Sequence, residues 1–159
     1  MKRIHLLRSG IFAVAVAIAA LAASLDVAAG AATSAHAARS QKIQLRHTSL
    51  GTLLVDSSGF TVFRFSKDTG RKNTCITTSE CSTTWPPLTS SGQPSAGPGV
   101  KSSLLSTIKL PNGKRQVTYA GHPLYRYSLA GERGETSYAG VKQFGGTWFA
   151  VSASGANVK

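Results

Sequence analysis

The chain repeats one short pattern at two places, and this repetition restricts the folds open to it more than any other feature. Residues 59–66 (GFTVFRFS) match residues 121–128 (GHPLYRYS) at an offset of 62. In both, a glycine precedes a hydrophobic residue, an aromatic, an arginine, a second aromatic and a serine. Residues 84–89 (TWPPLT) match residues 147–152 (TWFAVS) at an offset of 63. Two matching blocks in the same order predict two copies of one structural unit.

The residues in and around each copy are typical of short strands. Residues 51–68 alternate apolar and polar stretches around a Ser-Ser-Gly turn and carry β-branched and aromatic bulk. The Asn-Gly pair at 112–113 is a strong tight-turn signal ahead of two more strand-like runs, and the glycine-flanked run 146–152 predicts a closing strand. Residues 90–100 form a Gly/Pro/Ser loop, whereas residues 102–110 fit a short helix or a strand equally well.

The N-terminus has the three parts of a secretory signal peptide. Lys2, Arg3 and Arg8 supply positive charge, an apolar run follows, and Ala35 and Ala37 are small enough for the −3 and −1 positions of a cleavage site. We expect residues 1–37 to be removed by cleavage near Ala37. A retained membrane anchor is the alternative, but the run is short and mostly alanine, whereas a spanning helix needs about 20 strongly apolar residues. No cysteine precedes Cys75, so the chain lacks a lipid-anchor cysteine.

These patterns predict an all-β protein with few or no helices after the signal peptide, because no stretch shows a long amphipathic helical period. We expect a flexible lead-in over 38–48, followed by a small antiparallel β domain over 49–155. That domain is built from two sequence repeats, the first over about 51–89 and the second over about 115–152.

The charge balance favours anionic partners. Without residues 1–37 the chain keeps 15 lysines and arginines, the 18 of the whole chain less Lys2, Arg3 and Arg8, against five acidic residues. An exported protein with this excess would meet anionic cell-wall polymer or an anionic lipid surface. The charges are scattered in ones and twos, so we expect no specific nucleic acid recognition. A basic surface that only keeps the protein soluble remains the alternative.

The two cysteines are expected to form a disulfide. Cys75 and Cys81 stand alone, with only His47 and His122 as histidines beyond the signal peptide, so neither a four-ligand zinc site nor a Cys-x-x-Cys redox site or haem motif can be assembled from the pattern. Export to an oxidising compartment makes a disulfide the default. Closing this short loop stabilises the fold by about 2 kcal/mol on the chain-entropy model. We expect no metal site and no cofactor.

The combined motifs resemble a known family. The stretches are an aromatic-x-aromatic-x-x-Asp segment, the cysteine pair, Trp-Pro-Pro-Leu, Gly-x-Pro-Leu-Tyr-x-Tyr and Gly-Gly-x-Trp. Together they resemble the bacterial secreted repeat of unknown function, also described as predicted lipoproteins with a Yx(FWY)xxD motif. The resemblance covers about residues 49–155 and implies an exported cell-envelope protein without an established activity. The motif residues here are Phe63, Phe65, Asp68, Trp85, Pro86, Pro87, Tyr125, Tyr127 and Trp148.

The chain departs from the motif twice. Phe63 occupies the usual tyrosine position of the first copy, and Ala130 replaces the aspartate of the second. If the aspartate served one function in both repeats, only Asp68 could supply it here.

The alternation of the aromatic segments places two arginines on one face. Phe63 and Phe65, like Tyr125 and Tyr127, are two residues apart and share a sheet face, so the arginine between each pair points to the opposite, solvent face. If a pseudo-twofold axis relates the repeats, Arg64 and Arg126 are a candidate anion-binding pair; two solvated arginines are the alternative. For Trp85 we favour core packing over a ligand-stacking role, because Trp-Pro-Pro segments commonly form sheet edges.

Three functions remain open, and the first is preferred. It is a non-enzymatic, exported cell-envelope module that binds anionic surface material. The second is a redox accessory protein that holds a metal or haem through His47, His122 or tyrosines. The third is a small secreted hydrolase that uses carboxylates, although Asp56, Asp68, Glu132 and Glu135 are explained as turn residues and no nucleophile motif is present, so no catalytic residue is assigned.

Overall fold

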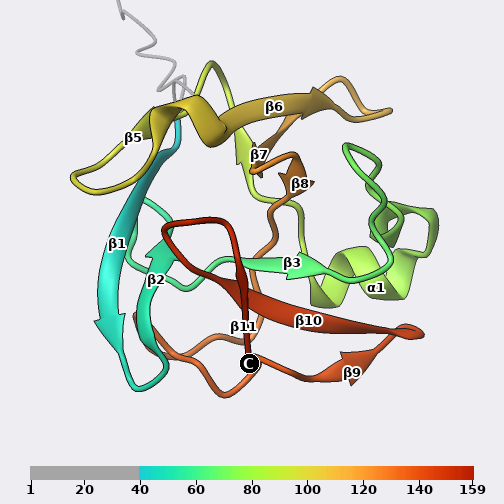
Figure 1. The fold of residues 1–159 in the computed structure, drawn as a ribbon. Coiled ribbons are helices and arrows are strands. Elements are labelled where there is room, and N and C mark those ends of the chain that lie inside the picture. The colour runs from blue at the N-terminus through green and yellow to red at the C-terminus, as the bar shows by residue number, and fades with distance from the viewer. Residues whose placement is uncertain (1–39) are drawn as a thin grey trace, which may run out of the picture. The chain divides into compact units, whose positions relative to one another are not determined.

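The structure, a computed structural model, describes residues 40–159 (Figure 1). The predicted signal peptide and its cleavage site near Ala37 lie outside the described residues. Within residues 40–159, no helix is long and apolar enough to cross a membrane.

Short strands make up most of the regular structure, as the sequence predicted. They are β1 (Lys42–Thr48), β2 (Gly51–Val55), β3 (Phe63–Phe65), β4 (Thr89–Ser90), β5 (Ser95–Ala96), β6 (Leu105–Lys109), β7 (Arg115–Tyr119), β8 (His122–Pro123), β9 (Lys142–Gln143), β10 (Gly146–Val151) and β11 (Asn157–Val158). The helical segments are the 3-10 turns η1 (Cys75–Thr77) and η2 (Ser102–Leu104) and the short helix α1 (Ser79–Thr84). The all-β prediction is therefore confirmed.

The strands form three small sheets. One has the order β2-β1-β5, one has β11-β10-β3 with β9 added to β10, and one has β4-β7-β6 with β8 added to β7. The pairs are antiparallel except for β1 with β5, which run parallel. Figure 1 shows β1 and β2 as one hairpin and β3 lying along β10.

The prediction of a flexible lead-in over 38–48 is wrong for the residues that form β1. This strand pairs with β2 through five residue pairs, from Gln44 with Val55 to Thr48 with Gly51. Its buried Ile43 anchors it in the core. The polar residues that alternate with the apolar ones made the segment look like a linker, but they lie on the solvated side of a half-buried strand. The domain also extends past residue 155, since β11 pairs with the end of β10.

The two repeats have the same hydrogen bonds at equivalent positions. Val62 donates its N–H to Leu54 (3.2 Å), and its counterpart Leu124 donates to Val117 (2.9 Å). The hairpin β1–β2 of the first repeat therefore corresponds to β6–β7 of the second. Gly59 and Gly121, the glycines that open the repeated pattern, both have positive φ angles, 88° and 80°, which glycine adopts without strain. Each repeat thus begins one strand earlier than the sequence pattern indicated.

The repeats interlock at their centre. Phe63 and Tyr125 exchange both backbone N–H···O bonds, each 2.9 Å long. Strand β3 of the first repeat pairs with β10 of the second, and Ser66 donates to Thr147 (2.9 Å). The equivalent bond of the other repeat runs from Ser128 to Thr84, also at 2.9 Å. Each aromatic segment therefore pairs with the tryptophan segment of the other repeat.

Two hydrophobic clusters fill the domain, one on each side of the central segments. Val62 and Leu124 belong to a mainly aliphatic cluster with residues of the two hairpins, among them Ile43, Leu54, Leu105 and Val117. Phe63 and Tyr125 belong to a cluster with the two tryptophans and the disulfide. The central segments are thus buried on both faces where they cross.

Candidate functional site

The aromatic residues of the motif surround two stacked tryptophans. The Trp85 and Trp148 rings are parallel within 4°, with centroids 4.0 Å apart, and both side chains are fully buried. Each ring contacts an aromatic residue of its own copy in a matching way: Phe63 meets Trp85 edge-on at 5.2 Å, and Tyr125 meets Trp148 edge-on at 5.1 Å. The Trp85 indole N–H donates to the Gln143 side-chain oxygen (2.8 Å). These residues form the core and present no ring face for ligand stacking.

Asp68, the one aspartate of the motif, links the two repeats from a buried position. The Tyr125 hydroxyl donates to its Oδ2 (2.6 Å), while the Thr74 backbone N–H and hydroxyl both donate to its Oδ1 (2.8 and 2.7 Å). Asp68 is only 5% exposed. Burial, and then the neighbouring Asp68 carboxylate, raise the pKa of Tyr125 far above its ordinary value, so the phenol stays protonated and remains a donor.

The two departures from the motif are the two halves of one missing pair. By the repeat correspondence, Phe63 takes the place of Tyr125 and Ala130 the place of Asp68. The backbone is the same in both copies: Asp68 donates its N–H to Phe65 (3.1 Å), and Ala130 donates to Tyr127 (3.3 Å). In this chain the tyrosine of the second repeat therefore bonds the aspartate of the first, and the two residues that would form the equivalent bond in the opposite direction are Phe63 and Ala130.

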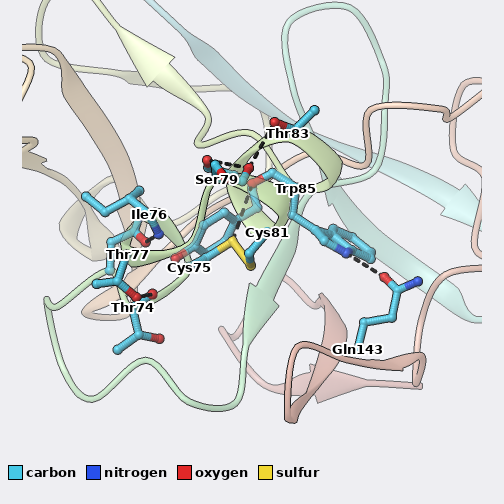
Figure 2. The surroundings of a disulfide bond; sticks show 12 residues. Thr74, Cys75, Ile76, Thr77, Ser79, Cys81, Thr83, Trp85 and Gln143 are labelled. Atoms are coloured by element: carbon cyan, nitrogen blue, oxygen red, sulfur yellow. Dashed lines mark hydrogen bonds between the residues drawn. A yellow bond between two sulfur atoms is a disulfide. The ribbon is translucent and has the colours of Figure 1, made fainter.

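The predicted disulfide between Cys75 and Cys81 is confirmed (Figure 2). It joins η1 to α1, and both cysteines are buried against the tryptophan cluster. This disulfide loop, residues 69–84, is also fastened to the second repeat by the Asn73 side chain, which donates to the Gln116 side-chain oxygen (2.6 Å) in a buried position. The disulfide closes the loop on itself, and the Asn73–Gln116 bond holds the loop against β7.

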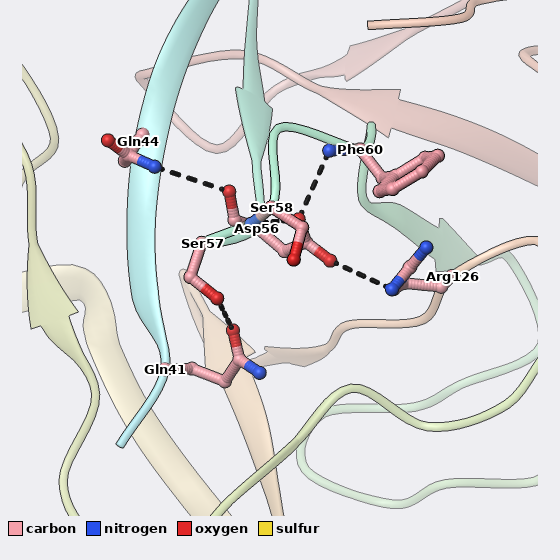
Figure 3. Close-up of polar contacts among 7 residues, drawn as sticks. All are labelled: Gln41, Gln44, Asp56, Ser57, Ser58, Phe60 and Arg126. Carbon is pink, nitrogen blue, oxygen red and sulfur yellow. Dashed lines mark hydrogen bonds and ion pairs between the residues drawn. The ribbon is translucent and has the colours of Figure 1, made fainter. Parts of the chain in front are cut away.

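Arg126 makes an internal ion pair (Figure 3). Its Nη1 lies 3.2 Å from Asp56 Oδ2, and its guanidinium lies over the Phe60 ring, 4.3 Å from the centroid. Asp56 is 2% exposed and also accepts the backbone N–H groups of Ser58 (2.8 Å) and Phe60 (3.1 Å) through Oδ1. Arg126 thus balances a carboxylate that organises the turn between β2 and β3.

Arg64 contacts His122 and the C-terminal turn. Its Nη2 donates to His122 Nε2 (2.8 Å), and its Nη1 donates to the Gly155 carbonyl (3.3 Å). Because a guanidinium can only donate, His122 Nε2 accepts and the ring proton sits on Nδ1. Burial lowers the pKa of His122, the Arg64 charge lowers it further, and Asp68 opposes this in part. Burial also lowers the pKa of Arg64.

The expectation that Arg64 and Arg126 point into solvent from an exposed face is wrong. Both are half-buried, because the face that they share also carries the buried Val62 and Leu124. The sequence alternation identified the common face correctly, but it could not show that the aliphatic cluster around Val62 and Leu124 covers the middle of that face. Each guanidinium is engaged by groups of the domain itself.

The remaining candidates lie apart or in local contacts. His47 is exposed on β1, where its Nδ1 lies 3.0 Å from the Thr52 hydroxyl. Glu135 Oε2 accepts the backbone N–H of Gly131 (3.1 Å), as a turn carboxylate does. Within the described residues, no group of three or more His, Cys, Asp or Glu side chains is gathered in a way that could hold a metal.

A groove that the sequence reasoning missed lies between the disulfide loop and the β6–β7 turn. Two adjoining surface pockets, of about 510 and 620 Å³, share Asn73, Ile76, Leu110 and Pro111 in their walls. We call this pair of pockets the basic groove. The smaller pocket adds exposed cations; the larger adds Pro87 and small polar groups. The cations of the smaller pocket are Arg71, Lys72 and Lys109.

The basic groove contains no acidic residue among its described lining residues. The Arg71 guanidinium donates to the Thr107 carbonyl of β6, which holds the disulfide loop against that strand. Lys109 lies directly opposite Arg115 in the β6–β7 ladder. The paired charges at 71–72 and 114–115 were visible in the sequence, but their approach to Lys109 depends on how the loop docks.

Comparison with known proteins gives a family and no individual relative. The family described as "Secreted repeat of unknown function" matches the chain twice, over residues 45–89 and 106–152. The first match includes part of β1, in agreement with the strand that the structure adds to the first repeat. No curated protein and no solved structure matches the chain significantly.

Proposed function

Because the chain belongs to the family described as secreted repeat of unknown function, we propose that it acts outside the cytoplasm as a non-enzymatic cell-envelope module that binds anionic surface material. The observation that carries the proposal is how the charges are distributed over the domain. Asp56 and Asp68 are buried, where Asp56 pairs with Arg126 and Asp68 accepts a hydrogen bond from Tyr125, so neither forms an ion pair with the exposed lysines and arginines.

The cations, in contrast, remain at the surface. Within residues 40–159 the pair Arg126–Asp56 is the one ion pair. The cations of the basic groove and of the β6–β7 turn are exposed: Arg71, Lys72, Lys109, Lys114 and Arg115. Uncompensated positive charge on a domain attracts polyanions and anionic membrane surfaces. The engagement of the buried carboxylates in structural bonds also supports a role without acid–base catalysis.

The test is binding of the mature protein to polyphosphate, as a soluble polyanion, and to vesicles containing phosphatidylglycerol. We expect binding at low salt that weakens steeply as salt rises, because the affinity comes largely from counterion release. Vesicles of phosphatidylcholine alone are the control and should not bind. Absence of binding to both anionic probes at low ionic strength would refute the proposal.

A further inference from the structure

One wall of the basic groove, the disulfide loop, is fixed by a disulfide within it and by hydrogen bonds to β6 and β7. The disulfide loop on one side is stapled by Cys75–Cys81 and tied to β7 by the Asn73–Gln116 bond of 2.6 Å. The Arg71 guanidinium ties the same loop to β6. Because this loop is fixed in advance, a ligand binds in the groove without the entropic cost of ordering it.

One end of the groove has the chemistry of an anion site. Arg71, Lys72 and Lys109 approach it from two elements, and all three are exposed. Lys109 also faces Arg115 across the ladder, and like charges in directly opposite positions destabilise a strand pair. A bound phosphate or carboxylate would balance the charge of Lys109 and accept hydrogen bonds from the Arg71 guanidinium.

The other end is mostly apolar. Ile76 and Pro87 are half-buried there, and Leu110 is only 5% exposed at the base. Removing such surface from water is favourable at roughly 25 cal/mol per Å². A ligand with charge along its whole length would leave this end unused.

We propose that the basic groove binds an anionic amphiphile, with a phosphate or carboxylate head at Arg71, Lys72 and Lys109 and a single aliphatic chain along Ile76, Pro87 and Leu110. The proposal rests on the proposed function and narrows it to one class of anionic material. Charge complementarity at one end and apolar lining at the other select this ligand over a bare polyanion. The concave shape favours a single molecule over the flat surface of a bilayer.

The experiment measures binding of dodecyl phosphate, below its micellar concentration, to the mature protein by titration calorimetry. Inorganic phosphate tests the head alone, and dodecyltrimethylammonium tests the chain with the opposite charge. We expect dodecyl phosphate to bind at least about tenfold more tightly than either control, because only it satisfies both ends.

Matched variants locate the site. Lys72→Gln with Lys109→Gln should weaken dodecyl phosphate binding about tenfold. The pair Lys101→Gln with Lys142→Gln removes equal charge from exposed positions outside the groove and should change the affinity by less than about twofold. Ile76→Asn should weaken dodecyl phosphate and leave phosphate binding unchanged. Near-ultraviolet circular dichroism and Tm of each variant establish that it folds.

The outcomes separate this inference from the proposed function. Equal affinity for phosphate and dodecyl phosphate, or equal losses of dodecyl phosphate affinity in the two lysine double variants, would refute the proposal that the groove binds an anionic amphiphile. If the protein binds polyphosphate or vesicles but does not bind dodecyl phosphate, only the proposal that the groove binds an amphiphile is overturned. If none of the three probes binds, the proposed function is refuted too. Binding of dodecyl phosphate that the groove variants weaken supports the proposal.

Discussion

Deleting the Tyr125 hydroxyl should destabilise the domain more than deleting a comparable hydrogen bond between a buried hydroxyl and one neutral partner. Tyr125→Phe removes the donor 2.6 Å from Asp68 Oδ2, in a site where the carboxylate is 5% exposed. A hydrogen bond to a charged group contributes about 1.5–3 kcal/mol, and its loss leaves one carboxylate oxygen without that partner. For a domain of this size each kcal/mol lowers Tm by roughly 4 °C, so we expect a fall of roughly 6–12 °C.

The measurement is urea unfolding of wild type and variant, read as a change in the free energy of unfolding at constant m. The matched control is Tyr119→Phe. Tyr119 is as buried as Tyr125, but its hydroxyl has only neutral partners: it donates to the Ala153 carbonyl (2.7 Å) and accepts the backbone N–H of Lys101 (3.1 Å). Each of these two neutral bonds should contribute about 0.5–1.5 kcal/mol. If Tyr125→Phe costs no more than half of the loss in Tyr119→Phe, which is the average for one of its two bonds, the assignment of the motif pair as a charge-assisted link between repeats is refuted.

Alkaline pH supplies a second readout of the same bond. The pKa of Tyr125 is raised in the folded state, so its contribution is fully present below pH 10 and is lost as pH rises above the pKa of the unfolded chain. The free energy of unfolding of wild type should therefore fall more steeply above pH 10 than that of Tyr125→Phe, by up to about 1.4 kcal/mol per pH unit. Parallel curves would contradict the prediction.

Four further predictions follow from other contacts. Phe63→Tyr alone buries a hydroxyl without an acidic partner, but together with Ala130→Asp it should rebuild the missing motif bond, with a favourable coupling of about 1–2 kcal/mol in a double-mutant cycle; zero coupling would argue against the swapped pairing. Thiol titration of the unfolded, unreduced protein should find no free sulfhydryl, and Cys75→Ser with Cys81→Ser should lower the free energy of unfolding by about 2 kcal/mol. Arg126→Gln should cost about 1 kcal/mol because it leaves Asp56 buried without its cation, and Asp56→Asn in the same chain should recover part of that loss. Because the folded pKa of His122 is lowered, its stability contribution is present above pH 6.5 and is lost as pH falls below that value, so His122→Asn should show a shallower acid slope in Tm between about pH 6.5 and 5; an unchanged slope would exclude the histidine as the cause.

The amino-acid sequence by itself determined the strand composition, the repeat and the disulfide. These depend on local signals: β-branched and aromatic alternation, turn residues such as Asn112-Gly113, and two cysteines in an exported chain. The repeated pattern also placed Phe63 and Tyr125 in equivalent positions, which was correct. The predicted repeats began one strand too late. For the first repeat, β1 was missed because its mixture of polar and apolar residues, taken alone, is also typical of a linker.

The tertiary structure decided which repeat's residues meet. Asp68 bonds Tyr125 because the aromatic segment of each repeat pairs with the tryptophan segment of the other. Packing around Trp85 and Trp148 determines this pairing. The aliphatic cluster around Val62 and Leu124, beside which Arg64 and Arg126 are half-buried, forms only when the β1–β2 and β6–β7 hairpins close over the central segments. The basic groove likewise exists because the disulfide loop docks on β6 and β7, bringing Arg71 to Lys109. Local periodicity specifies which face of a strand is apolar, but contacts between residues far apart in the chain depend on how those faces are finally covered.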